Sequence, residues 1–174
     1  VFYNRFTENS YTSDVESFKK SISVFLTNYD LTTFTKKDNG STTDLLLGDA
    51  GDAEVMVSMH DYLKQLCEME DAKYVYLFTV PDKDHMQYIV TAASNDEDDE
   101  VVKKERNFGV TISIPDYDIE NVHKAAKGEF VGPSEVKNRY GHVYNYYFPI
   151  YQDDEVACVV GIDFDVSTVK KENR

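Results

Sequence analysis

The sequence contains no long apolar run and no familiar catalytic motif. No stretch of about 18 consecutive apolar residues occurs in the 174-residue chain, so we expect no membrane-spanning helix within it. The motifs GxSxG, GxxxxGKS/T, HExxH and GxGxxG are absent, and the four histidines are scattered without metal-ligand spacing. We therefore predict that the chain is not an enzyme and uses no cofactor. A hydrolase without a familiar motif remains the alternative.

Cysteine is scarce and tryptophan is absent. The two cysteines, Cys67 and Cys158, lie in apolar segments of helical and strand character, and no CxxC pair suggests a metal site. Buried free thiols are the expectation, and one disulfide is the alternative. The 13 tyrosines and 10 phenylalanines supply much of the apolar surface, and tyrosine, with its polar tip, suits half-buried pockets.

Basic residues are outnumbered, 18 against 32 acidic ones, which gives a net charge of −14. Such a surface repels phosphate backbones, so we predict no nucleic-acid partner. The acidic runs Asp82–Asp84, Asn95–Glu100 and Asp116–Asp118 do not match a calcium-binding loop, which needs several converging oxygen ligands. We expect solvated loops and no metal site there, with weak surface binding of a divalent ion left open.

Two segments carry apolar residues at helical spacing. The first predicts an amphipathic helix within residues 1–35, with its buried positions at Val15, Phe18, Ile22, Phe25 or Leu26, and Tyr29. Phe2 and Phe6 extend this face by two turns, whereas the capping-box pair Ser13 and Glu16 would start or kink the helix later. The second helix is expected over Asp52–Asp71, with a buried stripe of Val55, Met59, Tyr62, Leu63 and Leu66.

Runs of β-branched and aromatic residues predict five strands, at Lys73–Val80, Met86–Ala93, Glu129–Gly132, Val143–Tyr151 and Glu155–Asp165. Pro149 indicates an edge-like position or a bulge. A short helix is expected over Ile119–Lys127, ended by Gly128, while Val110–Ile114 is ambiguous. Adjacent hairpins make the sheet antiparallel. The predicted class is α+β, with a five-stranded antiparallel sheet and both longer helices packed on one face.

The last third of the chain holds an ordered series of short motifs. Tyr140-Gly141 leads to a strand with Pro149-Ile150-Tyr151, and a tight acidic turn then leads to a strand containing Gly161-Ile162-Asp163 and ending at Ser167. This series resembles the Cache family, extracytoplasmic relatives of PAS domains. The helix Ile119–Gly128, the strand Lys73–Val80 and the long N-terminal helix occupy the places that the family gives them, so the resemblance spans most of the chain.

The resemblance implies a single PAS-like unit of a bacterial transmembrane receptor: a chemoreceptor, histidine kinase or diguanylate cyclase. Residues 1–35 would form a stalk or dimer helix that supports a homodimer, 52–166 the sensor domain, and 167–174 an exit segment. The chain starts at Val1 and ends in a charged tail, and we read it as a piece of a longer protein. The domain would be extracytoplasmic, attached to the cell membrane only through flanking transmembrane helices outside the fragment.

The family's small-molecule ligands lie against the sheet, so the resemblance also implies a site. Asp163 matches the Asp of the family's Gly-x-Asp strand, which faces the ligand amine in amino-acid-binding members. Strand alternation adds Tyr76, Asn145 and Tyr147 as ligand-binding candidates, with Gly161 leaving room for the ligand. Tyr88, on the neighbouring predicted strand, is a further candidate. Because Arg106-Asn107-Phe108 departs from the Arg-x-Trp-Tyr motif, an α-amino acid is not implied. The competing hypothesis is a PAS-like structural or interaction domain whose tyrosines are core.

Overall fold

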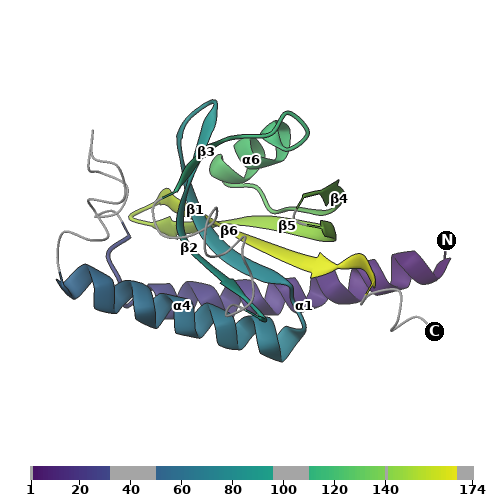
Figure 1. The fold of residues 1–174 in the computed structure, drawn as a ribbon, viewed down its shortest axis with the longest axis horizontal. Helices are drawn as coiled ribbons and strands as arrows, with labels where there is room; N and C mark the ends of the chain where they lie inside the picture. The colour runs from purple at the N-terminus through teal and green to yellow at the C-terminus, as the bar shows by residue number, and fades with distance from the viewer. Residues whose placement is uncertain (1, 32–49, 96–109, 140, 168–174) are drawn as a thin grey trace.

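The computed structural model describes residues 2–31, 50–95, 110–139 and 141–167, with side chains from Thr12 and from Glu54 in the first two ranges. Three layers follow one another (Figure 1). Helices α1 (Phe2–Leu26) and α4 (Ala50–Glu70) lie side by side beneath a sheet, and the short helix α6 (Ile119–Ala126) lies above it. The predicted α+β class is correct.

The sheet has six antiparallel strands in the order β3-β2-β1-β6-β5-β4, one more than predicted. They are β1 (Tyr74–Asp82), β2 (His85–Ala93), β3 (Thr111–Ser113), β4 (Val131–Asn138), β5 (Gly141–Gln152) and β6 (Glu155–Asp165). The extra strand, β3, is three residues long and pairs with the start of β2. The predicted strand at 129–132 begins two residues later and runs six residues further, as β4. Both are edge strands defined by pairing rather than by an apolar pattern.

The helix predictions hold at most positions. Helix α1 runs unbroken past Ser13, so that residue neither starts nor ends a helix. Its predicted stripe is buried at Val15, Phe18, Ile22 and Leu26, whereas Phe25 and Tyr29 pack at the margin. Helix α6 ends at Ala126, and Gly128 follows with φ +110°, a backbone conformation that glycine adopts without strain.

A bulge in β2 decides which of its residues face the two sides of the sheet. Leu77 pairs with Val90, but Phe78 pairs with Tyr88, so Ile89 is the extra residue. Ile89 and Val90 both join the core beneath the sheet, while Tyr88 and Met86 face the opposite side. Without the bulge, alternation from Thr91 would place Tyr88 against the helices.

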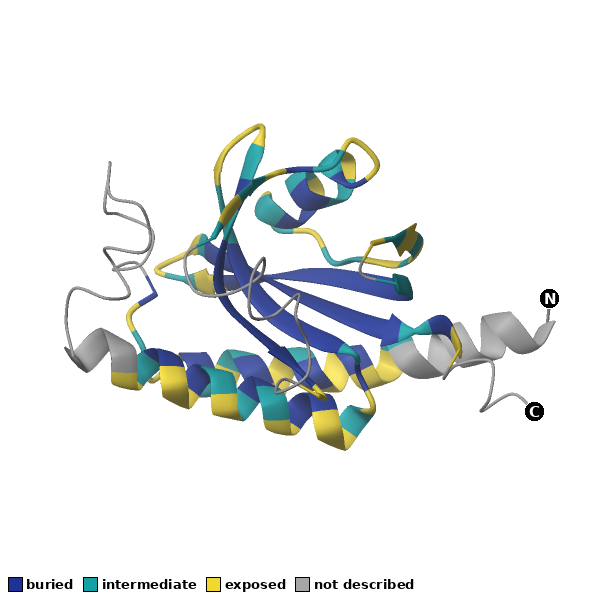
Figure 2. Ribbon diagram, in the orientation of Figure 1, coloured by how far each residue is buried: buried dark blue, intermediate teal, exposed yellow. Residues whose placement is uncertain are grey.

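The strands separate two apolar clusters. Figure 2 shows the buried strands lying between the helices below and α6 above. The lower cluster joins α1 and α4 to one face of the sheet. The upper cluster is smaller and richer in tyrosine; it contains Tyr74, Tyr76, Phe78, Tyr88 and Tyr147. Pro149 pairs only with Val159 of β6 because the β4 ladder ends at Tyr147, which gives the edge-like position expected for a proline.

Polar contacts also fix α1 to the sheet. The Tyr146 hydroxyl is hydrogen-bonded to Thr12 Oγ1 at 3.0 Å. The Gln152 side chain donates to the carbonyls of Leu26 and Tyr29 and accepts from the Leu31 amide, so the end of β5 caps the end of α1. The Leu26 carbonyl also accepts from the Tyr29 amide, so Gln152 adds a second donor there and fixes the chain that follows the helix.

Both cysteines are buried and free, as expected from the sequence. Cys67 Sγ donates to the Ala92 carbonyl, and burial raises the pKa of the Cys158 thiol to about 12. Among the described residues, no helix combines the length and apolar character needed to cross a bilayer.

Candidate ligand-binding site

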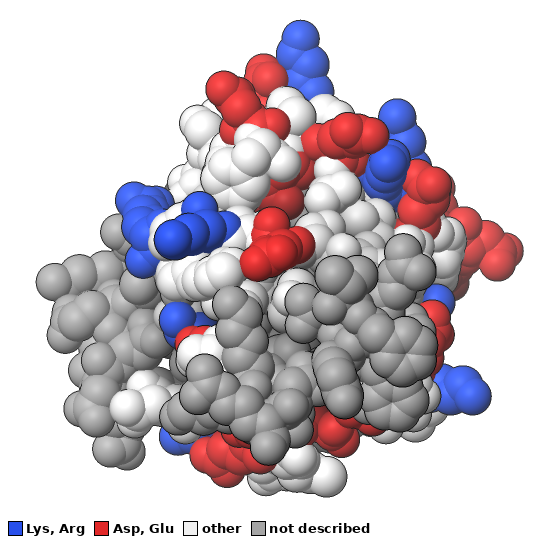
Figure 3. All heavy atoms as spheres, turned by 90° about the vertical axis from the view of Figure 1, so that its right-hand side faces the viewer, with Lys and Arg blue, Asp and Glu red and all other residues white. Residues whose placement is uncertain are grey.

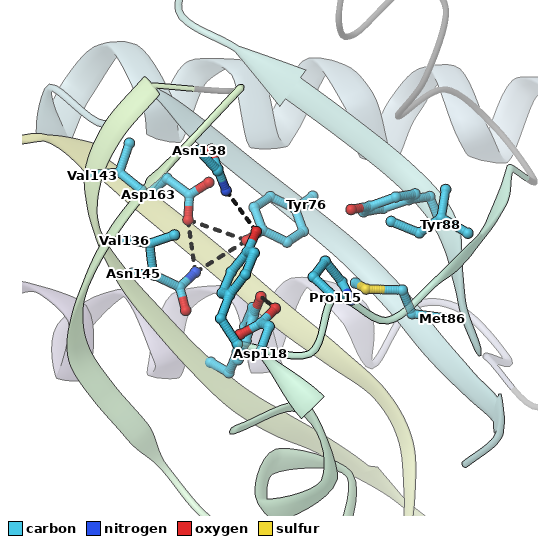
Figure 4. Close-up of a pocket in the computed structure, with 13 residues that line it drawn as sticks. Tyr76, Met86, Tyr88, Pro115, Asp118, Val136, Asn138, Val143, Asn145 and Asp163 are labelled. Atoms are coloured by element: carbon cyan, nitrogen blue, oxygen red, sulfur yellow. Dashed lines mark hydrogen bonds between the residues drawn. The ribbon is translucent and has the colours of Figure 1, made fainter. Parts of the chain in front are cut away.

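A cavity of about 40 Å³ lies on the upper face of the sheet, away from α1 and α4. Strands β1, β2, β5 and β6 form its floor through Tyr76, Tyr88, Asn145, Tyr147 and Asp163. Its cover comes from the chain between β3 and α6 and from the end of β4, and Figure 4 shows these side chains converging. This volume is well below the roughly 300–1,000 Å³ of typical ligand pockets.

A closed triangle of hydrogen bonds lies at one side of the cavity (Figure 4). Asn145 Nδ2 donates to Asp163 Oδ1 at 2.7 Å and to the Tyr76 hydroxyl at 3.1 Å. The Tyr76 hydroxyl donates to the same Asp163 oxygen at 3.1 Å. Asp163 and Asn145 are only 5% and 4% exposed, so this is a buried polar network in an aromatic surrounding. Such networks fix side-chain positions when their members are satisfied.

A second carboxyl group faces the cavity from its cover. Asp118, the residue just before α6, is buried and accepts a 2.6 Å hydrogen bond from the Tyr147 hydroxyl. Burial, followed by the nearby Tyr76, Asp118 and Asp163, raises the pKa of Tyr147 well above its usual value. The phenol therefore stays protonated and acts as a donor. This bond ties the cover to the floor.

The rim of the cavity is closed by a further contact. Asn138 Nδ2, at the end of β4, donates to the hydroxyl of Tyr117 at 2.7 Å. Tyr117 is more than half exposed, so this contact lies at the surface while the bond between Tyr147 and Asp118 lies inside. The chain from Pro115 to Asp118 is thus held at two points.

In this structure Gly161 makes room for the Tyr76 ring, whereas the sequence-based expectation was room for a ligand. A Cβ atom at position 161 would lie 2.1 to 2.7 Å from Cε2, Cζ and the hydroxyl of Tyr76. The phenol ring therefore lies directly over the glycine. The pairing of Tyr76 with Gly161 across β1 and β6 produces this contact.

The five predicted ligand-binding residues all line this one cavity. The sequence did not identify Asp118, which was expected in a solvated loop, or the rim residues Tyr117 and Asn138. The position of Asp118 just before a helix was a usable signal, because acidic residues favour helix starts. Arg106 to Phe108 lie outside the described residues. No cluster of three or more metal-ligating side chains occurs in the part of the chain that the structure describes.

One buried oxygen on the upper face of the sheet, outside the lining of the cavity, has no hydrogen-bond partner. Thr91 is 3% exposed, and its Oγ1 atom is unsatisfied. Thr91 pairs with Tyr76 across β1 and β2, so the two side chains lie on the same face of the sheet. Leaving a buried hydroxyl unpaired costs about 1–3 kcal/mol.

On the face that Figure 3 presents, charge on the described residues does not single out a second site. Figure 3 shows lysine and arginine side chains lying among aspartate and glutamate on the face it presents. Two partly exposed pairs are His85 with Asp82 and His142 with Glu135. The hydrogen bond from His85 lowers the pKa of Asp82. The acidic groups that converge on a cavity are Asp118 and Asp163.

No protein-family model matches the chain, and no curated protein matches it in sequence. Solved structures do match it in shape. The sensory domain of the Campylobacter jejuni chemoreceptor Tlp3 (CcmL) superposes with a TM-score of 0.57 and 15% identity, over 94% of this chain and 56% of that one. The chain shares the fold of part of this sensory domain.

Two further structures of the same chemoreceptor domain carry ligands. One, in complex with L-valine, gives a TM-score of 0.55 with 14% identity, and one with isoleucine bound gives 0.53 with 13% identity. Each match covers 95% of this chain and 56% of the solved chain. The chain thus spans little more than half the length of the sensory domains it resembles. The PAS-like fold expected from the sequence agrees with this likeness.

Proposed function

We propose that the chain is an extracytoplasmic sensor domain that binds a small molecule in the cavity around Asp163. One observation carries the proposal: side chains from four strands, chosen from the sequence as ligand contacts, meet at one buried cavity with a carboxyl group at its edge. Ligand sites combine apolar and aromatic walls with a few fixed polar groups, and this cavity has that composition.

The two carboxyl groups favour a ligand with an amine or another cationic donor. Asp163 and Asp118 face the cavity from its floor and its cover. A charge-assisted hydrogen bond to such a group contributes about 1.5–3 kcal/mol. The Tlp3 sensory domain, of the same fold, is solved with L-valine and with isoleucine, which both carry an amine.

The proposal extends to the receptor around the domain. Residues 52–166 form the sensor unit, a single PAS-like domain of the Cache type, and residues 1–35 and 167–174 connect it to flanking transmembrane helices. In Figure 1, β6 ends toward the N-terminal half of α1, an arrangement that suits a chain entering and leaving on one side. Because Phe18 and Ile22 pack against the sheet, a homodimer through α1 would use its exposed side, around Val24.

A second candidate is a PAS-like structural or interaction domain without a ligand. The observation in its favour is the small volume of the cavity. The domain's own tyrosines fill much of the space and leave about 40 Å³. This volume is well below the roughly 300–1,000 Å³ of typical ligand pockets. The two candidates therefore differ in whether the cavity opens for a ligand.

A binding screen separates the two candidates. A thermal-shift screen on the chain of residues 1–174 tests amines, amino acids and carboxylates, including n-butylammonium, butyrate and L-valine. The affinities of the compounds that bind are then measured by calorimetry. We expect an amine to bind and butyrate not to bind. Asp163→Asn, which keeps the shape and removes the charge, should weaken binding at least about tenfold.

Asp153→Asn is the matched control, because it removes one negative charge from the exposed β5–β6 turn of the same hairpin. Its affinity should stay within about twofold of the unsubstituted chain, since exposed charges away from the site are screened. Unchanged affinity in Asp163→Asn would remove Asp163 from the site. A screen without any binder would favour the structural candidate.

A further inference from the structure

Tyr76 occupies the space beside the polar group that the ligand would need. We propose that Tyr76 is an internal competitor for the ligand site: its phenol fills the site in the ligand-free domain, and a ligand binds by displacing it. This inference rests on the proposed function, because it specifies how that site is kept closed and opened.

The volume of the cavity requires that something moves. About 40 Å³ is well below the roughly 300–1,000 Å³ of typical ligand pockets, so a ligand with a carbon skeleton needs space that side chains now fill. Closely packed interiors do not yield such space by small adjustments, so a whole side chain must leave its position.

Tyr76 is the side chain whose removal opens space at Asp163. Its ring covers Gly161, and its hydroxyl bonds to both Asp163 and Asn145. The phenol thus takes the hydrogen bonds that a ligand would otherwise make. Tyr147, by contrast, directs its hydroxyl to Asp118 in the cover, so displacing it would loosen the cover and leave Asp163 covered.

Tyr76→Phe tests the inference because it removes the competing hydroxyl and keeps the ring. Affinities for n-butylammonium and L-valine are measured by calorimetry on the unsubstituted chain and on the variant. The variant lacks the hydroxyl that bonds to Asp163 and Asn145, so the closed state is less stable. We therefore expect ligand binding to tighten about tenfold. Tyr146→Phe is the control: it removes a hydrogen-bonded hydroxyl from a buried tyrosine on the opposite face of the sheet, and should leave affinity within about twofold.

The outcomes distinguish this inference from the proposed function. Tighter binding by Tyr76→Phe, or binding by that variant alone, supports the competitor role. Equal or weaker binding than the unsubstituted chain overturns it and leaves the sensor function standing. No binding by either protein overturns both.

A second measurement needs no variant. In the unsubstituted chain with ¹³C-labelled tyrosine rings, a bound ligand should shift the ring signals of Tyr76 more than those of Tyr146. Signals of Tyr76 that stay in place at saturating ligand would overturn displacement.

Discussion

At the scale of single residues, one contact determines the shape of the site. Tyr76 can lie flat against β6 only because residue 161 has no side chain. That position brings the phenol to Asp163 and Asn145, which come from two different strands. The glycine therefore positions the tyrosine, and the tyrosine closes the cavity.

Gly161→Ala should destabilise the domain by about 1–3 kcal/mol, because the new methyl group overlaps the Tyr76 ring and forces it out of place. The free energy of unfolding, measured by urea denaturation, checks this. In a Tyr76→Ala background the same substitution should cost much less, since the overlapping ring is gone. Equal costs in both backgrounds would show that the contact with Tyr76 is not the cause.

Residue-level features of the site were predictable only in part. The Gly-x-Asp motif and strand alternation identified residues that line the cavity, because each strand shows its period in the sequence. Tyr88 lines it only because of the bulge at Ile89, which alternation does not reveal. Asp118 was missed because an Asp-Tyr-Asp loop is usually solvated, and here Tyr147 supplies the partner that allows its burial.

At the scale of the elements, α1 is part of the domain's core. Its residues Phe18, Ile22 and Leu26 are buried with the sheet, and Gln152 fixes its C-terminal end. This helix therefore moves with the sheet unless that packing changes. In the proposed function, a signal from the cavity would reach α1 through the sheet between them.

Ile22→Ala should lower the free energy of unfolding by about 2–5 kcal/mol, because it deletes a fully buried side chain of the lower cluster. Val24→Ala, on the same helix but 69% exposed, should change it by no more than about 0.5 kcal/mol. Denaturant unfolding of both variants measures the difference. Similar values for the two would mean that α1 does not share the domain's core.

The elements were predictable where the apolar pattern is strong. Both long helices and the four long strands follow from their periodicity, as do the hairpins that make the sheet antiparallel. Strand β3 and the full length of β4 were not predictable. Their residues are largely exposed, so only pairing with β2 and β5 defines them.

At the scale of the whole molecule, the sheet separates two functions. One face packs against α4 and against α1, which we propose connects to the membrane, and the other carries the cavity (Figure 1). A second, open hollow lies on the helix side, lined by Lys20, Ser21, Val24, Phe25 and Tyr62. It has no buried carboxyl group among these residues, so we assign ligand binding to the Asp163 cavity.

The most direct test of this assignment is a ¹H–¹⁵N correlation spectrum of the labelled chain, titrated with the tightest-binding amine from the screen. The account predicts the largest shifts at the side-chain amide of Asn145 and at the backbone amides of Gly161 and Asp163. Shifts that centre instead on Ser21 and Val24 in the helix-side hollow, with the Asn145 amide unmoved, would contradict it.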